Sequence, residues 1–327
     1  MPQVSAADVA RLAGVSGQTV SRVANGSPRV DPTTRARVEA AMTQLGYRPN
    51  RSARALRTGR SGTIGVVVRT LASVGNTRML EAVTAAASAR DHAVLVVTLS
   101  ETDDRVAADA AFAALRDHGV DGAVVLNEAT PTIHDAAEPG FPVVAVDADA
   151  SDRFAAIASD HAGGAASATA HLLALGHRTV HHIAGPHGSL AARERERGWR
   201  EALDAAGAPV PEVLRGDWTA QTARRLADGL VADPAVTAVF AANDQMALGA
   251  LHAAHAAGQH DLAVAGFDDV VDAAHYWPPL TTVAQDFEEL GSTAIRLLLG
   301  LLDGEPAAPH TVVPTRLVVR ESSLPPR

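Results

Sequence analysis

The sequence lacks cysteine and lysine altogether and is poor in aromatic residues. Without Cys among its 327 residues, disulfides, thiolate zinc sites and thiol nucleophiles are excluded. All 28 basic residues are Arg, and aromatic residues make up only 3%. No apolar run reaches the roughly 18 residues that a membrane span needs, and Arg11 and Arg22 interrupt the apolar residues at the amino terminus. We therefore expect a cytoplasmic globular protein without a signal peptide or membrane anchor.

Charge is divided unevenly along the chain. Residues 1 to 60 hold ten Arg against three acidic residues, a net charge of +7, whereas the remainder holds 18 Arg against 34 acidic residues, a net charge of -16. An acidic body repels phosphate except where the basic head touches it. This distribution predicts a nucleic-acid contact confined to the amino-terminal end.

Two short helices joined by a tight turn are expected in this basic head. Ser5 is placed as the N-cap of a helix over Ala6 to Ala13, and Gly14 ends that helix. Ser16 is placed as the N-cap of a second helix that runs to Asn25. Polar residues of the second helix fall at i, i+3, i+4 and i+7 on one face: Gln18, Ser21, Arg22 and Asn25.

A third helix completes a helix-turn-helix unit. Asp31 and Pro32 begin it and Gly46 ends it. In such a unit the second helix enters the major groove, where Arg22 matches guanine and Gln18 matches adenine in bidentate fashion. Other polar side chains of that helix are better suited to phosphates: Thr19, Ser21 and Asn25. A small core is expected from Val9, Ala13, Val15, Val20 and Ala24.

The segment RPNRSARALRTGRSG after Tyr47 predicts a short fourth helix, capped by Asn50 and ended by Gly59. Helices shorter than about 12–15 residues rarely persist alone in water. We therefore expect this helix to be disordered until a partner orders it. Leu56, its only large apolar residue, either packs against the rest of the protein or acts as a wedge in a DNA minor groove; the residues alone slightly favour packing.

From Thr63 onward, apolar strands alternate with helices. The expected strands include TIGVVV, AVLVVT, GAVVL and PVVAVD, and after Asp160 the pattern starts again with TVHHIAG, a strand near Val213, AVFAAND and LAVAGFDD. Continuous apolar strands alternating with helices indicate parallel sheets covered on both faces. The fold class is therefore α/β, with a helix-turn-helix head and a body of two doubly wound subdomains.

Ligands of such sheets bind beyond the carboxyl ends of the strands. Those ends carry hydrogen-bonding residues: Arg69, Asn127, Asp147, Asn243, Asp244, Asp268 and Asp269. Asp and Asn engage adjacent hydroxyls, so this set suits a polyol or sugar. Trp218 either stacks on a sugar ring or packs in the core, and one member of the Asn243–Asp244 pair is expected to be only a helix N-cap.

Signals for catalysis and metal binding are weak. The sequence contains no Walker A, G-x-G-x-x-G after a strand, G-x-S-x-G or H-E-x-x-H pattern. His181 and His182 lie in one expected strand and so point to opposite faces, which is poor geometry for one metal. We expect neither an enzyme nor a cofactor.

Several long strings in order make the chain resemble the lactose/galactose repressor (LacI/GalR) family of DNA-binding transcription regulators over nearly its whole length. They are DVARLAGVSGQTVSRVANG, TRARVEAAMTQLGYRPNRSARAL, LGHRTVHHIAGP, RERERGW, GDW, ANDQMALGA, GFDD and PPLTTVAQDFEELG. The resemblance implies a helix-turn-helix domain (1-47), a hinge helix and linker (48-61), and a body (62-327) similar to periplasmic sugar-binding proteins. Its N-subdomain would span about 62-159 and 287-314, and its C-subdomain about 160-286 and 315-327.

The resemblance also implies residue roles. It makes Leu56 the hinge wedge, reversing the preference for packing, and gives as DNA-contacting positions Ser16, Gly17, Gln18, Thr19, Ser21, Arg22, Asn25, Asn50, Ala53 and Leu56. It places in the effector pocket Arg69, Asp147, Arg195, Trp218, Asn243, Asp268, Gln285 and Phe287. Gly17 replaces a bulky side chain of the family's type member, which puts one base contact in doubt, and Arg69 and Ser73 also differ, so the sugar is open.

We therefore expect a homodimer that represses carbohydrate genes from a near-palindromic double-stranded operator and is released by a small sugar or glycoside of the β-galactoside or β-glucoside type. The chain stops at SSLPPR without a leucine-rich tetramerising tail, which favours the dimer. Corepression in place of induction is the first alternative. A sugar-transport receptor and a sugar-modifying enzyme are further alternatives, disfavoured by the basic head and by the missing acid–base motifs.

Overall fold

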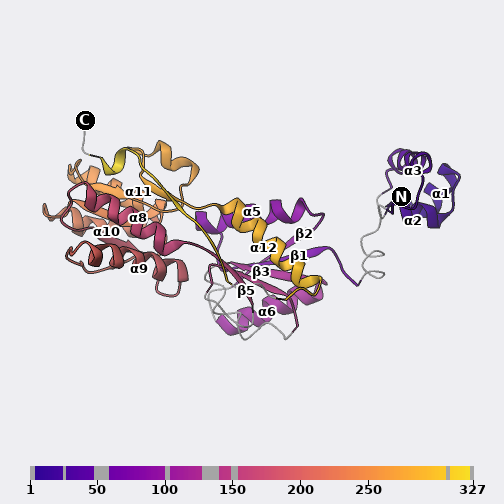
Figure 1. Cartoon of the computed structure of the whole chain (residues 1–327), viewed down its shortest axis with the longest axis horizontal. Coiled ribbons are helices and arrows are strands. Elements are labelled where there is room, and N and C mark those ends of the chain that lie inside the picture. The colour runs from indigo at the N-terminus through magenta and orange to yellow at the C-terminus, as the bar shows by residue number, and fades with distance from the viewer. Residues whose placement is uncertain are drawn as a thin grey trace. The chain divides into compact units, whose positions relative to one another are not determined.

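A computed structural model describes residues 4–24, 27–47, 59–99, 104–126, 140–148, 154–306 and 310–324. Its contacts divide the chain into two compact units, Met1–Gly62 and Thr63–Arg327 (Figure 1). We call these units the head and the body. The expected helix over residues 50 to 58, with Asn50, Ala53 and Leu56, lies outside the described residues, as does Asn25.

The described residues of the head form three helices whose ends are those expected from the caps. They are α1 (Ala6–Ala13), α2 (Gly17–Ala24) and α3 (Pro32–Leu45). Ser5 and Asp8 form a reciprocal capping box at the start of α1, and the Asp31 side chain accepts from the N–H groups of Thr33 and Thr34 at the start of α3. The fully buried residues of the small core are Val9, Val20 and Val38. Val15 and Ala24 are only partly buried.

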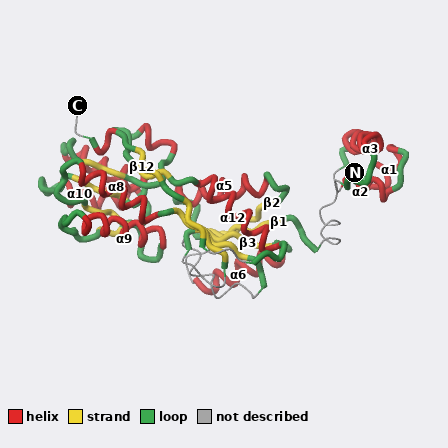
Figure 2. The backbone as a smooth tube through the Cα atoms, in the orientation of Figure 1, coloured by secondary structure: helices red, strands yellow, loops and turns green. Residues whose placement is uncertain are grey.

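The first lobe of the body is a six-stranded parallel sheet with the order β11-β5-β4-β3-β1-β2. Its strands are β1 (Thr63–Val68), β2 (Ala93–Thr98), β3 (Gly122–Leu126), β4 (Val143–Val146), β5 (Ala155–Ser159) and β11 (Thr311–Val313). Helices α5 (Val74–Ser88) and α12 (Phe287–Leu302) cover one face and α6 (Asp104–Asp117) the other (Figures 1 and 2). Successive valines of β1 therefore enter two different cores, which explains why the strand is apolar without alternation.

The second lobe is a four-stranded parallel sheet with the order β7-β6-β8-β9. Its strands are β6 (His181–Ala184), β7 (Leu214–Arg215), β8 (Ala238–Ala241) and β9 (Ala263–Ala265). Helices α8 (His161–Ala174) and α9 (Leu190–Ala205) pack on one face, and α10 (Ala220–Val231) and α11 (Asp244–Ala257) on the other. Two 3-10 turns, η2 (Val271–His275) and η3 (Glu321–Ser323), follow β9 and the later strand β12 (Arg316–Val318).

Three chain segments pass between the lobes. They join β5 to α8, β10 (Thr282–Ala284) to α12, and β11 to β12 (Arg316–Val318). Strands β10 and β12 form an antiparallel pair that packs against α8. The subdomain boundaries expected near residues 160, 287 and 315 lie on these segments and stay a prediction. Within the described residues no helix is both long enough and apolar enough to cross a membrane.

Candidate operator-reading helix and ligand cavity

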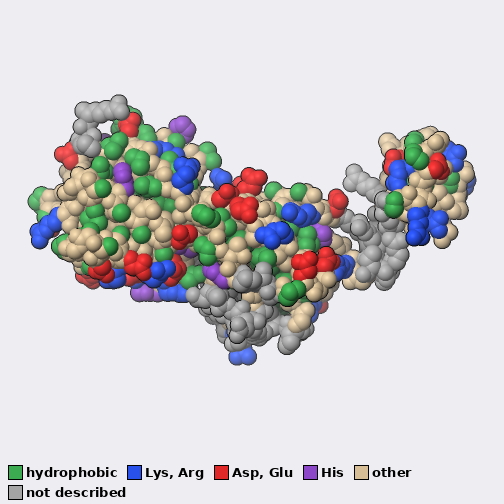
Figure 3. Space-filling model, viewed as in Figure 1, with side chains coloured by type: hydrophobic (Ala, Val, Ile, Leu, Met, Phe, Trp, Pro, Cys, Tyr) green, Lys and Arg blue, Asp and Glu red, His purple; other side chains and the backbone are tan. Residues whose placement is uncertain are grey.

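Helix α2 of the head presents one polar face and buries the other. Val20 and Val23 are buried in the core, whereas Gln18 and Arg22 are exposed. The Ser16 hydroxyl accepts from the N–H of Thr19 at 3.1 Å and so caps the helix. Basic side chains stand out on the surface of the head in Figure 3. The helix is thus held by its apolar side and leaves Gln18 and Arg22, the side chains predicted to read bases, in solvent.

An open depression beside α2 contains an arginine that the sequence reasoning missed. It is lined by Val15, Ser16, Thr19, Arg22, Arg29, Val30, Asp31 and Thr34. Arg29 is exposed and lies in the turn before α3. Its position two residues before the Asp31 N-cap is the only sequence signal that it carries. Gly17 has open space around its Cα, so the start of α2 has room for close approach of another backbone.

A small cavity of the body brings together seven of the eight predicted effector residues. It has a volume of about 30 Å³ and is lined by Ser73, Gly75, Met79, Asp147, Ala191, Arg195, Trp218, Asn243, Asp268, Gln285 and Phe287. Its walls come from both lobes, because α5 and α12 belong to the first lobe and α9 to the second. Arg69 does not line this cavity; Ser73 and Gly75 at the start of α5 do.

Arg195 of α9 is the cation of this cavity. Only 4% of the residue is exposed, and its guanidinium stacks on the Phe267 ring at 3.8 Å from the centroid. Its Nη1 donates to the carbonyl oxygen of Ala242, and its Nη2 lies 3.4 Å from Oδ1 of Asp268. Its Nε donates to Nδ1 of His161 at 3.4 Å. These contacts hold the guanidinium in one plane against the cavity wall.

Two buried carboxylates face this guanidinium with opposite pKa shifts. Burial would raise the pKa of Asp147, but His161 and Arg195 outweigh it and the pKa is lowered. For Asp268 burial prevails over Arg195 and the Gln285 hydrogen bond, so its pKa is raised. Asp147 and Asp268 have φ angles of 50° and 113°, a strained region for residues with a Cβ. Both residues line the cavity.

Trp218 owes its position to a glycine and to a strained backbone. Its φ is 72°, and a Cβ on Gly185 would lie 2.3 Å from the indole ring. The Asn243 Nδ2 donates to the Trp218 carbonyl at 3.1 Å, while its Oδ1 accepts from the N–H of Met246. Asn243 is therefore the expected N-cap of α11, and it lines the cavity as well.

Asp244, next to Asn243 in the sequence, has a structural role. Asp244 is buried, and its carboxylate accepts hydrogen bonds from Thr282 Oγ1 and the Val270 N–H. Burial, and after it the charge of Asp268, raises the pKa of Asp244 well above the ordinary value.

His161, which contacts both Asp147 and Arg195, was not predicted from the sequence. It follows the Asp160 N-cap of α8 and belongs to no recognisable motif. Within the described part of the chain, no cluster of three His, Asp or Glu fits a metal ion.

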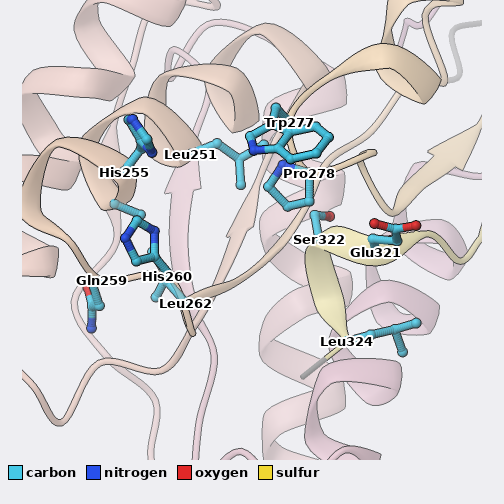
Figure 4. Close-up of a pocket in the computed structure, with 11 residues that line it drawn as sticks. Leu251, His255, Gln259, His260, Leu262, Trp277, Pro278, Glu321, Ser322 and Leu324 are labelled. Atoms are coloured by element: carbon cyan, nitrogen blue, oxygen red, sulfur yellow. The ribbon is translucent and has the colours of Figure 1, made fainter. Parts of the chain in front are cut away.

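A second hollow, of about 270 Å³, lies elsewhere on the second lobe (Figure 4). It lies between the end of α11, the Trp277–Pro278 segment and η3. His255 and His260 lie on one side of it and Glu321 and Ser322 on the other (Figure 4). It contains none of the residues predicted from the sequence to bind a ligand.

A basic helix-turn-helix head and a two-lobed body with a polar cavity define a DNA-binding regulator of the ligand-responsive class. Residues 6–50 match the model for bacterial regulatory proteins of the lacI family, and residues 169–323 match the periplasmic binding protein-like domain. The chain is 36% identical to the lactose operon repressor of Escherichia coli (strain K12), over all of this chain and 92% of that protein. It belongs to the lacI family of bacterial regulatory proteins.

Further similarities point the same way. The transcriptional regulator CelR of Thermobifida fusca is 37% identical, over 96% of each chain. A lac repressor dimer bound to operator and the anti-inducer ONPF has a TM-score of 0.84 at 34% identity, covering 99% of this chain and 100% of that one. A CelR–cellobiose complex has a TM-score of 0.72 at 34% identity, covering 98% and 100%. These relatives are transcription regulators.

Proposed function

We propose that the protein is a homodimeric repressor of carbohydrate genes that a small sugar or glycoside releases from a near-palindromic operator. Gln18 and Arg22 read base edges, and Thr19 and Ser21 contact phosphates. The main support for an effector-binding site is that seven of the predicted polar and aromatic residues line one cavity between the lobes. Operator binding places the protein in the cytoplasm.

The ligand class follows from the side chains of the cavity. Carboxylates and amides that accept and donate hydrogen bonds, together with an indole, suit the hydroxyls and the apolar face of a sugar. Arg195 is already engaged with Asp268, His161 and a carbonyl, so an acidic sugar would meet two carboxylates first. A neutral β-galactoside or β-glucoside fits best, and the similarity to regulators solved with ONPF and with cellobiose supports this.

The small size of the cavity determines how a sugar can enter it, and the proposed release of DNA depends on that step. The cavity, of about 30 Å³, is far smaller than the pockets of about 300–1,000 Å³ that usually hold small molecules. A sugar therefore enters only when the lobes separate, and closing on it gives an arrangement that differs from the empty one. If that arrangement moves the starting points of the two hinge segments apart, operator binding weakens by about 1–3 kcal/mol. We propose induction; a sugar that raised operator affinity would establish corepression.

The deciding experiment measures both sites on the full-length protein. Fluorescence anisotropy with DNA from upstream of its own gene should show nanomolar-range, salt-dependent binding that lactose or cellobiose weakens. Saturable sugar binding without any specific DNA binding would establish the receptor alternative instead. Release of product from o-nitrophenyl glycosides by the purified protein would establish the enzyme alternative; we propose that none occurs.

The first substitution tests the DNA side. Arg22→Ala should reduce the preference for operator over random DNA by about 5- to 100-fold, because a bidentate contact to guanine contributes about 1–3 kcal/mol. Salt-dependent binding to random DNA should persist. Arg37→Ala removes the same charge from an exposed position of α3 and should leave the preference unchanged. Equal preference in both variants would remove Arg22 from the reading set.

The second substitution tests the sugar side. Trp218→Ala should weaken sugar binding about tenfold or more while operator affinity without sugar stays constant. Gly185→Ala should act in the same direction, because its Cβ displaces the indole. Gly188→Ala, in the same loop with open space around it, is the matched control. Wild-type sugar affinity in Trp218→Ala, measured by calorimetry, would make this residue part of the core only.

A further inference from the structure

Six residues of the body form a closed circuit of hydrogen bonds and one ion pair, which we call the interlobe ring. Its members are Asp147, Ser159, His161, Arg195, Asp268 and Gln285. Ser159 Oγ donates to Gln285 Oε1 at 2.6 Å, and Gln285 Nε2 donates to Asp268 Oδ1 at 2.7 Å. Ser159 ends β5, Asp268 follows β9, and Gln285 lies on the segment from β10 to α12. This side of the ring therefore joins the first lobe to the second.

The other side of the ring passes through His161. Asp268 Oδ1 pairs with Arg195 Nη2 at 3.4 Å, and Arg195 Nε donates to His161 Nδ1 at 3.4 Å. His161 Nε2 lies 2.8 Å from Asp147 Oδ1, which also accepts from the Ser159 N–H at 3.2 Å. Asp147 follows β4 of the first lobe, whereas His161 begins α8 of the second. His161 is thus the second point at which the ring crosses between lobes.

The partners of His161 determine where its proton lies. Arg195 Nε has only a hydrogen to offer, so Nδ1 of His161 must accept with its lone pair. Nε2 therefore carries the proton and donates to the Asp147 carboxylate. Only 2% of His161 is exposed, and its ring lies against Phe267, with 5.8 Å between the ring centroids. The imidazole therefore uses both nitrogens, one toward each lobe.

We propose that His161 is a positioning residue that fixes Asp147 and Arg195 for the ligand and couples ligand binding to closure of the lobes. This inference rests on the proposed sugar-binding function of the cavity. Asp147 and Arg195 line the cavity, and His161 contacts both from behind it. The bond between His161 and Asp147 joins residues of different lobes, so it opposes separation of the lobes. The ring therefore favours closed lobes over separated ones, and a ligand that holds Asp147 and Arg195 also favours closure, around its own volume.

Three substitutions test the two hydrogen bonds of His161 one at a time and together. His161→Gln places an amide nitrogen where Nε2 stood and keeps the bond to Asp147. His161→Asn places an amide oxygen where Nδ1 stood and keeps the bond to Arg195. His161→Phe fills the same volume and keeps neither. We expect affinity for the probe sugar, lactose or cellobiose, to fall about 10- to 100-fold in His161→Phe and less in the other two.

Coupling is read from the ratio of operator affinities with and without saturating sugar. This ratio should approach one in His161→Phe, while operator affinity without sugar stays within about threefold of wild type. A residue that only filled space would tolerate phenylalanine, with sugar affinity and ratio unchanged, and that result would overturn the proposal. Intermediate values for His161→Gln and His161→Asn, both folded by circular dichroism, support it; wild-type values in both overturn it.

A measurement without sugar separates this proposal from the proposed function. Long-range ¹H–¹⁵N correlation of the imidazoles should show His161 as the neutral tautomer protonated on Nε2, and Asp147→Asn should change that signal. A tautomer protonated on Nδ1, or a signal that Asp147→Asn does not change, would contradict the hydrogen bonds proposed for His161 in the interlobe ring. If wild type binds neither lactose nor cellobiose, the choice of sugar fails, while the tautomer still decides whether His161 joins the lobes.

Discussion

Arg195→Leu is expected to destabilise the body by about 3–5 kcal/mol and to abolish sugar binding, because it leaves buried carboxylates without their cation. Leucine fills part of the space against Phe267 but accepts and donates nothing. The Ala242 carbonyl, Nδ1 of His161 and Asp268 would each lose a partner. The measurement is urea unfolding of the body, followed by circular dichroism, together with sugar titration of the folded variant.

The neighbouring Arg197 provides the matched control. It lies two positions further along α9 and pairs with Glu194 and Glu201, but its side chain is 51% exposed. Arg197→Leu should therefore cost at most about 1 kcal/mol and leave sugar binding intact. Equal losses in the two variants would show that helix α9, and not the buried ion pair, determines the effect.

The pH dependence of the Arg195→Leu deficit identifies its cause. The pKa of Asp268 is raised by burial, and Arg195 opposes that rise. Without the guanidinium, Asp268 takes up a proton more readily in the folded body, and a protonated carboxyl needs no cation. The folded state then binds more protons than the unfolded state, so the deficit should be smaller at about pH 5 than at about pH 8. A deficit that is independent of pH would contradict this account.

Sequence patterns predicted the head and most of the body well, because the signals there are local. Ser5, Asp31 and Gly46 act on adjacent backbone groups, so the helix ends in the head agree with the structure. Strand β5 was missed, since its sequence AAIAS has little β-propensity and is a strand only between two neighbours. The short strands β11 and β12 likewise depend on pairing partners distant in the sequence.

The cavity was predictable only in part. Strand ends and the family resemblance indicated seven of its residues; Arg69 is not among the lining residues, and its role in ligand binding stays a prediction. His161 carries no local signal: its role comes from two lobes meeting at a crossing segment. The positive φ angles of Asp147, Trp218 and Asp268 are also set by tertiary contacts. Roles that depend on long-range geometry need the structure.

Acidification is expected to destabilise the body by up to about 3 kcal/mol through His182 alone, between about pH 6.5 and pH 4. His182 of β6 is fully buried between Trp199 and Phe240, with ring centroids 5.2 and 4.9 Å away. Its Nδ1 donates to the Phe240 carbonyl at 2.9 Å, and its Nε2 finds no hydrogen-bond partner among the described residues. Burial lowers the pKa of His182 from 6.5 to about 4.

The sign of this effect follows from proton uptake. In the unfolded chain His182 binds a proton near pH 6.5, whereas in the folded body it stays neutral down to about pH 4. Within that pH range the unfolded state binds more protons than the folded state, so the free energy of unfolding falls as the pH falls. Above that range His182 does not make the free energy of unfolding depend on pH. His182→Phe should flatten this part of the curve whatever its stability at neutral pH. His118→Gln, at an exposed position, should keep the wild-type slope. Parallel curves for wild type and His182→Phe in urea unfolding from pH 7 to pH 4 would mean that a different buried group takes up the proton.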